Sequence, residues 1–511
     1  EAWRTMLITP LALAVCTLAA ASHALTAGWQ GPPPTRAAHR ARALKPCHLV
    51  FSAAAAVSGP FPPGADGSPL LGGGGTKAQP AAVRIQPVTP LPSFNDVLEP
   101  PKLGIFVRLL THLLSTSASC AVLAYTHARK VALSPRLVAC VLVVGAMLDV
   151  AVRRTLRLVA RQAMLVEPYK LATRDSRFAI IDTVRVHYVE RLPANSPPAR
   201  LRALVHMNHG FGANALSWLD VLTPIADALS AVVVAHDRVG FGLTERPRQL
   251  ALYASKENRA LARELLATVG AVRECEDAPH VLMGHSLGAQ LSLAQALEEP
   301  RRVQGLILVA PALLDGTPAA VSGRSGFIGV FGQAWIAFSS FSSGLASVIA
   351  MACLPLFLPL LRAAVYSRGF WASGLGAAWF DRARITAATL ERYRRPSLAR
   401  SWDLGLLRFV RATMATRGIP ISRCGRSAAE LLRDSGLPVL VVHGVQDRVV
   451  PVSASRRLVQ QLGPGATLVE LEDCGHVPHE ECPERFLDVV LPWMRARAKE
   501  KRGTRAWRTY N

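Results

Sequence analysis

The most informative stretch of the chain is residues 280–288, His280-Val281-Leu282-Met283-Gly284-His285-Ser286-Leu287-Gly288. Its beginning is short and mainly apolar, as in a buried strand, whereas residues 289–297 have helical spacing and strong helix formers. A Gly-x-Ser-x-Gly segment between a strand and a helix predicts a tight turn that lifts Ser286 Oγ clear of the sheet. Gly284 and Gly288 suit this turn because Cβ atoms beside the serine would crowd it.

A serine hydroxyl needs a base to take its proton and an acid to orient that base, so a carboxylate and a histidine should follow in the chain. The apolar run 437–442 predicts a strand, and Asp447 lies just past its end. The next strand-like run, 466–471, leads into a glycine and then His476. Loops at one edge of a parallel sheet carry the chemistry, so we predict Asp447 as the acid and His476 as the base.

Other residues nearby compete for these two roles. His443, at the end of the predicted strand, is better explained as a structural residue. Asp315, which follows another strand-like run at 306–310, is the alternative acid. His479 and Asp473 lie close enough to His476 in the sequence to remain open as alternatives.

The oxyanion that forms on the substrate needs hydrogen-bond donors. One donor should be the Leu287 N–H, next to the serine. The other should be the Phe211 N–H, because Gly210 and Gly212 let the loop after the strand-like run 204–208 turn sharply toward the nucleophile. The residues expected to support these two turns are His209, Gly210, Gly212, Gly284, His285 and Gly288.

These motifs, with Asp237 to Pro247, fall in the order and spacing of the α/β-hydrolase superfamily, which the chain resembles from about residue 176 to 493. The resemblance implies an α/β fold: a mostly parallel central sheet with flanking helices, an α-helical cap and, here, N-terminal hydrophobic helices. A closer likeness is to plant and algal membrane-associated members, which are largely uncharacterised. Asp182-Thr183 replaces the Asn-Gly that is usual at their hairpin turn.

Serine at the turn argues against the superfamily members that use aspartate there, such as dehalogenases and epoxide hydrolases. Serine members include esterases, lipases, thioesterases and acyltransferases, and other members are receptors or binding proteins. We expect hydrolysis of an ester or thioester with a bulky apolar part. An acyltransferase and a non-catalytic lipid-binding or scaffold protein remain open. No zinc, Walker or dinucleotide motif appears, so neither a metal nor a cofactor is expected.

The net charge of +23 raises the possibility of a nucleic-acid partner, but the distribution of charge favours a membrane. Residues 1–165 carry 16 Lys and Arg against 5 Asp and Glu, and the tail 495–508 carries 7 against 1. These charges adjoin hydrophobic segments, where Lys and Arg bind anionic lipid surfaces. Aromatic residues are not interleaved with the basic ones, so no base-stacking platform is expected.

The N-terminal part has the composition of a targeting and membrane-binding region. A short apolar run and a stretch without acidic residues make residues 1–65 a signal and transit-like leader, which favours a plastid membrane. Alternatives are the secretory or endomembrane system, or a leader that is only disordered. The apolar segments 109–126 and 137–152 are near the lower length limit for membrane spans, and a soluble helix pair is the alternative.

The expected cap is unusually apolar, because residues 325–361 contain no charged side chain. Such a cap would suit a long acyl or isoprenoid substrate, and packing against the core is the alternative. Nine cysteines without a pairing pattern suggest free thiols, and Cys474, beside His476, is a candidate inhibitor-sensitive site. The domain boundaries that we expect are 1–65 leader, 66–103 Pro/Gly-rich linker, 104–165 hydrophobic helices, 166–314 first core part, 315–415 cap, 416–494 second core part and 495–511 basic tail.

Overall fold

A central sheet of eight strands organises the part of the chain that the computed structural model describes, residues 134–194, 201–312, 358–415 and 427–499. The strand order is β1-β2-β4-β3-β5-β6-β7-β8. The strands are β1 Ser176–Ile181, β2 Val184–Arg191, β3 Ala203–Asn208, β4 Ala231–His236, β5 His280–His285, β6 Val303–Val309, β7 Val439–Gly444 and β8 Ala466–Leu471. Strands β1 and β2 pair antiparallel, as do β2 and β4, and every other pair is parallel.

The central strands read as continuous apolar runs because helices cover both faces of the sheet. On β5, Val281 and Met283 pack in a cluster with α5 and α16, whereas Leu282, between them, packs with α7, α13 and α14. The flanking helices are α5 Leu219–Leu229, α6 Ser255–Val272, α7 Gly288–Glu298, α13 Ala428–Ser435, α14 Val452–Leu462 and α16 Pro483–Lys499. The predicted mostly parallel sheet with flanking helices is therefore confirmed.

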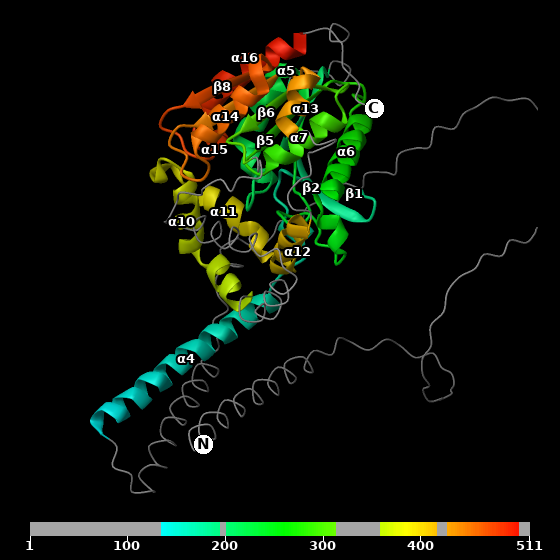
Figure 1. Cartoon of the computed structure of the whole chain (residues 1–511). Helices are drawn as coiled ribbons and strands as arrows, with labels where there is room; N and C mark the ends of the chain where they lie inside the picture. Colours follow the sequence, from blue (N-terminus) through cyan, green and yellow to red (C-terminus); the bar gives the residue numbers. More distant parts are fainter. Residues whose placement is uncertain (1–133, 195–200, 313–357, 416–426, 500–511) are drawn as a thin grey trace, which may run out of the picture. The chain divides into compact units, whose positions relative to one another are not determined.

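A group of helices is inserted between β6 and β7, where the sequence predicts the cap. Its described elements are α10 Arg368–Ala378, η5 Arg382–Arg384, α11 Ala387–Arg394, η6 Arg395–Leu398 and α12 Trp402–Ala415. Figure 1 shows α10, α11 and α12 gathered apart from the helices that flank the sheet. Most of the uncharged segment 325–361, together with Asp315, lies outside the described residues.

The N-terminal end of the described chain is a 29-residue helix, α4 Pro135–Ala163, which contains the predicted segment 137–152. Its C-terminal end contacts the cap, because Gln162 Nε2 donates to Tyr366 Oη at 2.9 Å and Arg161 lies over the Tyr366 ring. Among the described residues, no helix combines the length and the apolar character needed to cross a membrane. The other predicted segment, 109–126, lies outside the described residues.

Candidate active site

Ser286 occupies a strained turn between β5 and α7. Its φ is +51°, in the left-handed region that residues with a Cβ rarely adopt. A Cβ on Gly284 would lie 2.6 Å from Ala289 Cα, and a Cβ on Gly288 would lie 2.2 Å from Asn208 O. Both positions therefore require glycine, and the turn packs directly on the end of β3.

A continuous hydrogen-bond chain joins the three residues that the sequence predicts as catalytic. Ser286 Oγ lies 2.9 Å from His476 Nε2, and His476 Nδ1 lies 2.7 Å from Asp447 Oδ2. The other carboxylate oxygen, Asp447 Oδ1, accepts the N–H groups of Val449 and Val450 at 2.7 and 2.9 Å. The structure thus brings together residues that are up to 190 positions apart in the chain.

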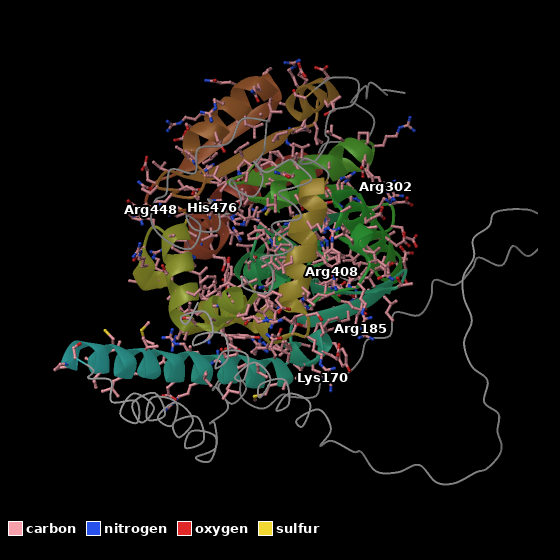
Figure 2. All side chains as sticks on the ribbon, turned by 60° about the horizontal axis from the view of Figure 1, so that its bottom comes forward. Lys170, Arg185, Arg302, Arg408, Arg448 and His476 are labelled. Atoms are coloured by element: carbon pink, nitrogen blue, oxygen red, sulfur yellow. The ribbon has the colours of Figure 1, made fainter. Side chains whose placement is uncertain are left out.

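The electrostatics around the Ser286–His476–Asp447 hydrogen bonds favour an ionised Asp447 carboxylate. Burial by itself would raise the pKa of the Asp447 carboxyl, but the charges and hydrogen bonds of His476 and His443 outweigh burial and hold that pKa well below its usual range. Figure 2 shows where His476 lies, close to the cap helices, which are yellow in this view. Ser286 and His476 are only 8% and 6% exposed, so both residues are largely shielded from water.

The loop predicted to donate to the oxyanion lies against the serine. A Cβ on Gly210 would come within 2.8 Å of His285 Nδ1 and 3.1 Å of Ser286 Cβ. Gly212 has a φ of +74°, which supplies the sharp turn that the sequence predicts. The Phe211 ring packs edge-on against Phe241, with centroids 5.5 Å apart. Phe211 and Leu287 therefore belong to two turns that both adjoin Ser286.

The sequence matches the model of the alpha/beta hydrolase family over residues 203–489, which is more than half of the chain. The chain belongs to the alpha/beta hydrolase family. This alpha/beta hydrolase is 27% identical over 307 residues to an uncharacterised Mycobacterium tuberculosis protein, a match that covers 59% of the chain and 76% of that protein. Rat monoglyceride lipase is 31% identical over 125 residues, which cover 24% of the chain and 40% of the lipase.

Two solved structures are similar in shape to this alpha/beta hydrolase. A membrane phospholipase A, described as a bacterial virulence factor, has a TM-score of 0.46 and 21% identity, covering 70% of the chain and 99% of the phospholipase. The 2-hydroxy-6-oxo-6-phenylhexa-2,4-dienoate hydrolase of a Rhodococcus strain has a TM-score of 0.42 and 21% identity, covering 61% and 95%. The closer likeness to plant and algal members stays a prediction.

The competing residues of this alpha/beta hydrolase have other contacts. His443 Nε2 lies 3.0 Å from Asp447 Oδ2 and its Nδ1 lies 2.7 Å from Ser455 Oγ, so His443 contacts the same oxygen of the predicted acid as His476 does. His479 is fully buried and stacks on Trp218 with centroids 4.1 Å apart. Asp473 is exposed.

His285 and His209 contact the backbone of the two loops that adjoin the serine. His285 Nε2 lies 2.8 Å from His476 O, so its ring supports the loop that carries the predicted base. His209 Nδ1 lies 2.7 Å from Gly210 O, and the Arg238 N–H donates to His209 Nε2 at 3.3 Å. Burial lowers the pKa of His209 to about 4, which keeps the imidazole neutral at pH 7. The supporting roles of both histidines stay predictions.

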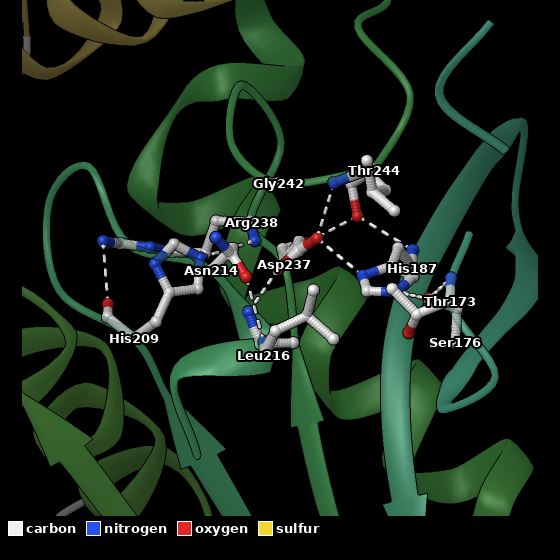
Figure 3. Close-up of polar contacts among 12 residues, drawn as sticks. Thr173, Ser176, His187, His209, Asn214, Leu216, Asp237, Arg238, Gly242 and Thr244 are labelled. Atoms are coloured by element: carbon white, nitrogen blue, oxygen red, sulfur yellow. Dashed lines mark hydrogen bonds and ion pairs between the residues drawn. The ribbon is translucent and has the colours of Figure 1, made fainter. Parts of the chain in front are cut away.

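A second Ser–His–Asp hydrogen-bond chain holds the loop around Phe211 in place. Ser176 Oγ lies 2.8 Å from His187 Nε2, and His187 Nδ1 lies 2.6 Å from Asp237 Oδ2 (Figure 3). The other oxygen, Asp237 Oδ1, accepts the Ala215 N–H at 2.5 Å. This chain has the connectivity of the first one, but its serine lies in a strand and not at a strained turn. The sequence pattern does not predict this second arrangement, although Asp237 belongs to the 237–247 motif.

The sequence marked Cys474 as a candidate inhibitor-sensitive residue, and its surroundings oppose that role. Cys474 is fully buried, and its Sγ lies 2.9 Å from Cys482 Sγ. The hydrogen bond with Cys482, together with burial, raises the pKa of the Cys474 thiol. A thiol that is buried and protonated is a poor target for alkylating reagents.

Glu480 is a buried carboxyl on α15 Pro478–Glu481 that should make stability depend on pH. Tyr393 Oη donates to Glu480 Oε1 at 2.5 Å, while Oε2 has no hydrogen-bond partner among the described residues. Burial raises the pKa of Glu480 from 4.5 to about 8. Between these two values the folded protein binds a proton that the unfolded chain has lost, so stability falls as the pH rises from about 4.5 to about 8.

Glu480→Gln should remove this loss, because glutamine resembles the protonated carboxyl. We expect the melting temperature of the variant to equal that of the wild type near pH 5 and to exceed it by a few degrees near pH 9. Thermal unfolding followed by circular dichroism between these values provides the measurement. Parallel curves for the two proteins would show that Glu480 stays ionised in the fold.

Proposed function

We propose that this alpha/beta hydrolase is a serine hydrolase that cleaves a carboxylic ester or thioester with a bulky apolar part. The observation that carries the proposal is the hydrogen-bond chain from Asp447 through His476 to Ser286. A serine on a strained turn, in contact with a histidine that an ionised carboxylate orients, is the arrangement that activates a hydroxyl for acyl transfer. The rat monoglyceride lipase match supports an ester substrate.

In the proposed reaction, Ser286 Oγ attacks the carbonyl carbon while His476 Nε2 takes the hydroxyl proton. The N–H groups of Phe211 and Leu287 stabilise the oxyanion. His476 then gives its proton to the leaving alcohol or thiol, and an acyl-enzyme forms. A water molecule attacks this ester with His476 again acting as base, and the acid and free Ser286 are released. Asp447 keeps Nδ1 protonated and stabilises the imidazolium in both halves.

The support for an apolar substrate lies in the cap. Residues 325–361 contain no charged side chain. Among the described cap residues, Leu375 and Trp379 pack in one apolar cluster with Val477, which directly follows the proposed base. Side chains of this kind favour an acyl chain over a polar or charged group.

The same proposal places the protein at a membrane, in a plastid or in the endomembrane system. The support is the basic charge of residues 1–165 and the exposed apolar residues of α4, of which Met147 is 68% and Val143 58% exposed. Retention of the full chain in the membrane fraction through a wash at about 1 M salt is the observation to make, since basic residues alone are screened within ~3 Å there. Release by salt would contradict anchoring by apolar residues.

A panel of p-nitrophenyl esters tests the substrate class. We expect kcat/KM to rise by at least about tenfold from acetyl to decanoyl esters, because each buried CH₂ group contributes ~0.8 kcal/mol before losses. A fluorophosphonate probe used alongside reports whether the serine is activated at all. Equal kcat/KM for short and long esters would contradict the apolar substrate, and turnover only in the presence of an added alcohol would identify an acyltransferase.

A further inference from the structure

The cap touches the proposed catalytic base through its backbone. The His476 N–H donates to Ala378 O, at the C-terminal end of α10, over 2.6 Å. One residue earlier, a Cβ on Gly475 would lie 2.3 Å from Ala378 O and 2.8 Å from Phe380 N. Only glycine permits this approach, so the end of α10 and the histidine loop, residues 472–477 between β8 and α15, are packed backbone against backbone.

One carboxylate binds both sides of this contact. Glu481 Oε2 accepts the Gly475 N–H at 2.8 Å, and Glu481 Oε1 accepts the Asp381 N–H in the cap at 2.7 Å. The backbone carbonyl of the same residue accepts Arg384 Nη1 at 2.9 Å. Glu481 is only 3% exposed, so water hardly competes for these hydrogen bonds. The carboxylate therefore bridges the residue before His476 and the residue that caps η5.

We propose that Glu481 is a positioning residue that couples the cap to the catalytic histidine. A displacement of the 378–381 segment moves the Asp381 N–H that donates to Glu481 Oε1. Because the carboxylate is rigid, its other oxygen then shifts the Gly475 N–H and, with it, the neighbouring His476. The base thus reaches its position against Ser286 only when the cap is seated. This inference rests on the proposed function, and it adds that cap position regulates the rate of acylation.

The neighbouring carboxyl group provides a matched control. Glu480 is also buried on α15 and also bonds to the cap, through Tyr393, but within the described part of the chain its side-chain oxygens make no hydrogen bond to the histidine loop. Glutamine at position 481 keeps the size of the side chain and replaces one acceptor oxygen by an NH₂ group, which faces an N–H. Glutamine at position 480 keeps the acceptor that Tyr393 uses. The pair therefore separates loss of positioning from loss of a buried carboxyl.

Glu481→Gln should slow fluorophosphonate labelling and lower kcat for a short ester by about 10- to 100-fold, with KM changed less than threefold, because the base is misplaced and substrate binding is not. Glu480→Gln should label within about twofold of the wild type. Wild-type labelling rates in Glu481→Gln, or equal losses of rate in both variants, would overturn the proposal.

Hydrogen exchange gives a readout that does not depend on activity. In Glu481→Gln, amides of 378–384 and of 474–477 should lose protection together, and in Glu480→Gln the 474–477 amides should keep it. Loss confined to the cap would overturn the coupling. Absence of labelling in the wild type would instead contradict the proposed function, while the exchange data would still decide whether Glu481 joins the two segments.

Discussion

Ser286→Ala should lose all fluorophosphonate labelling, and its kcat for an ester should fall by ~10⁶-fold. The reason is that, in the proposed mechanism, the Ser286 hydroxyl, 2.9 Å from His476 Nε2, forms the acyl-enzyme. The melting temperature should stay about the same, because alanine fits the turn and the strain at a φ of +51° is unchanged. Gel-based labelling and steady-state kinetics on the purified full chain are the measurements.

Ser176→Ala is the matched control for this prediction. Ser176 belongs to the other Ser–His–Asp chain, with hydrogen bonds of 2.8 and 2.6 Å that nearly equal those at Ser286. The Ser176 oxygen also accepts the Thr173 N–H at 2.9 Å, so this hydroxyl stabilises the local fold. Labelling should therefore persist in Ser176→Ala, with a reduced melting temperature. Loss of the label in Ser176→Ala with retention in Ser286→Ala would reverse the assignment.

Asp447→Asn should lower kcat by ~10⁴-fold. An asparagine at this position presents an NH₂ group to His476 Nδ1 or to His443 Nε2, both of which lie within 3.0 Å of Asp447 Oδ2. The base then adopts the wrong tautomer, and nothing stabilises its protonated form. Stopped assays that detect slow turnover are required.

Asp473→Asn, at an exposed position in the histidine loop, should retain full activity. Full activity in Asp447→Asn together with loss in Asp315→Asn would show that the acid had been assigned to the wrong strand end.

The turn at Ser286 and the loops of Asp447 and His476 could be predicted because each carries a local signature directly after an apolar strand. The flanking helices and parallel strands follow from the same alternation of short apolar runs and helical segments. The order of the strands in the sheet does not follow from this alternation. β4 lies between β2 and β3, which places Asp237 beside His187, and no pattern within either segment indicates that pairing.

The sequence does not indicate which backbone atoms the distant elements of the site contact. His285 supports His476 through a carbonyl oxygen, and Ala378 contacts the same residue through another. Every residue has a carbonyl group, so the sequence contains no signal for which one will be used. The signal that the sequence does contain is Gly475, because a glycine directly before the predicted base indicates that another segment approaches the backbone closely there.

The close approach of Ala378 O to Gly475 also limits how this protein can be altered or can diverge. Insertions or deletions elsewhere in the cap change its size and lining, but one extra residue between Ala378 and Asp381 would move either the carbonyl that His476 uses or the N–H that Glu481 uses. Insertions and deletions among natural sequences should therefore avoid residues 378–381. A cap transplanted from another hydrolase should be joined outside them, so that the graft brings a new lining and leaves the native junction intact.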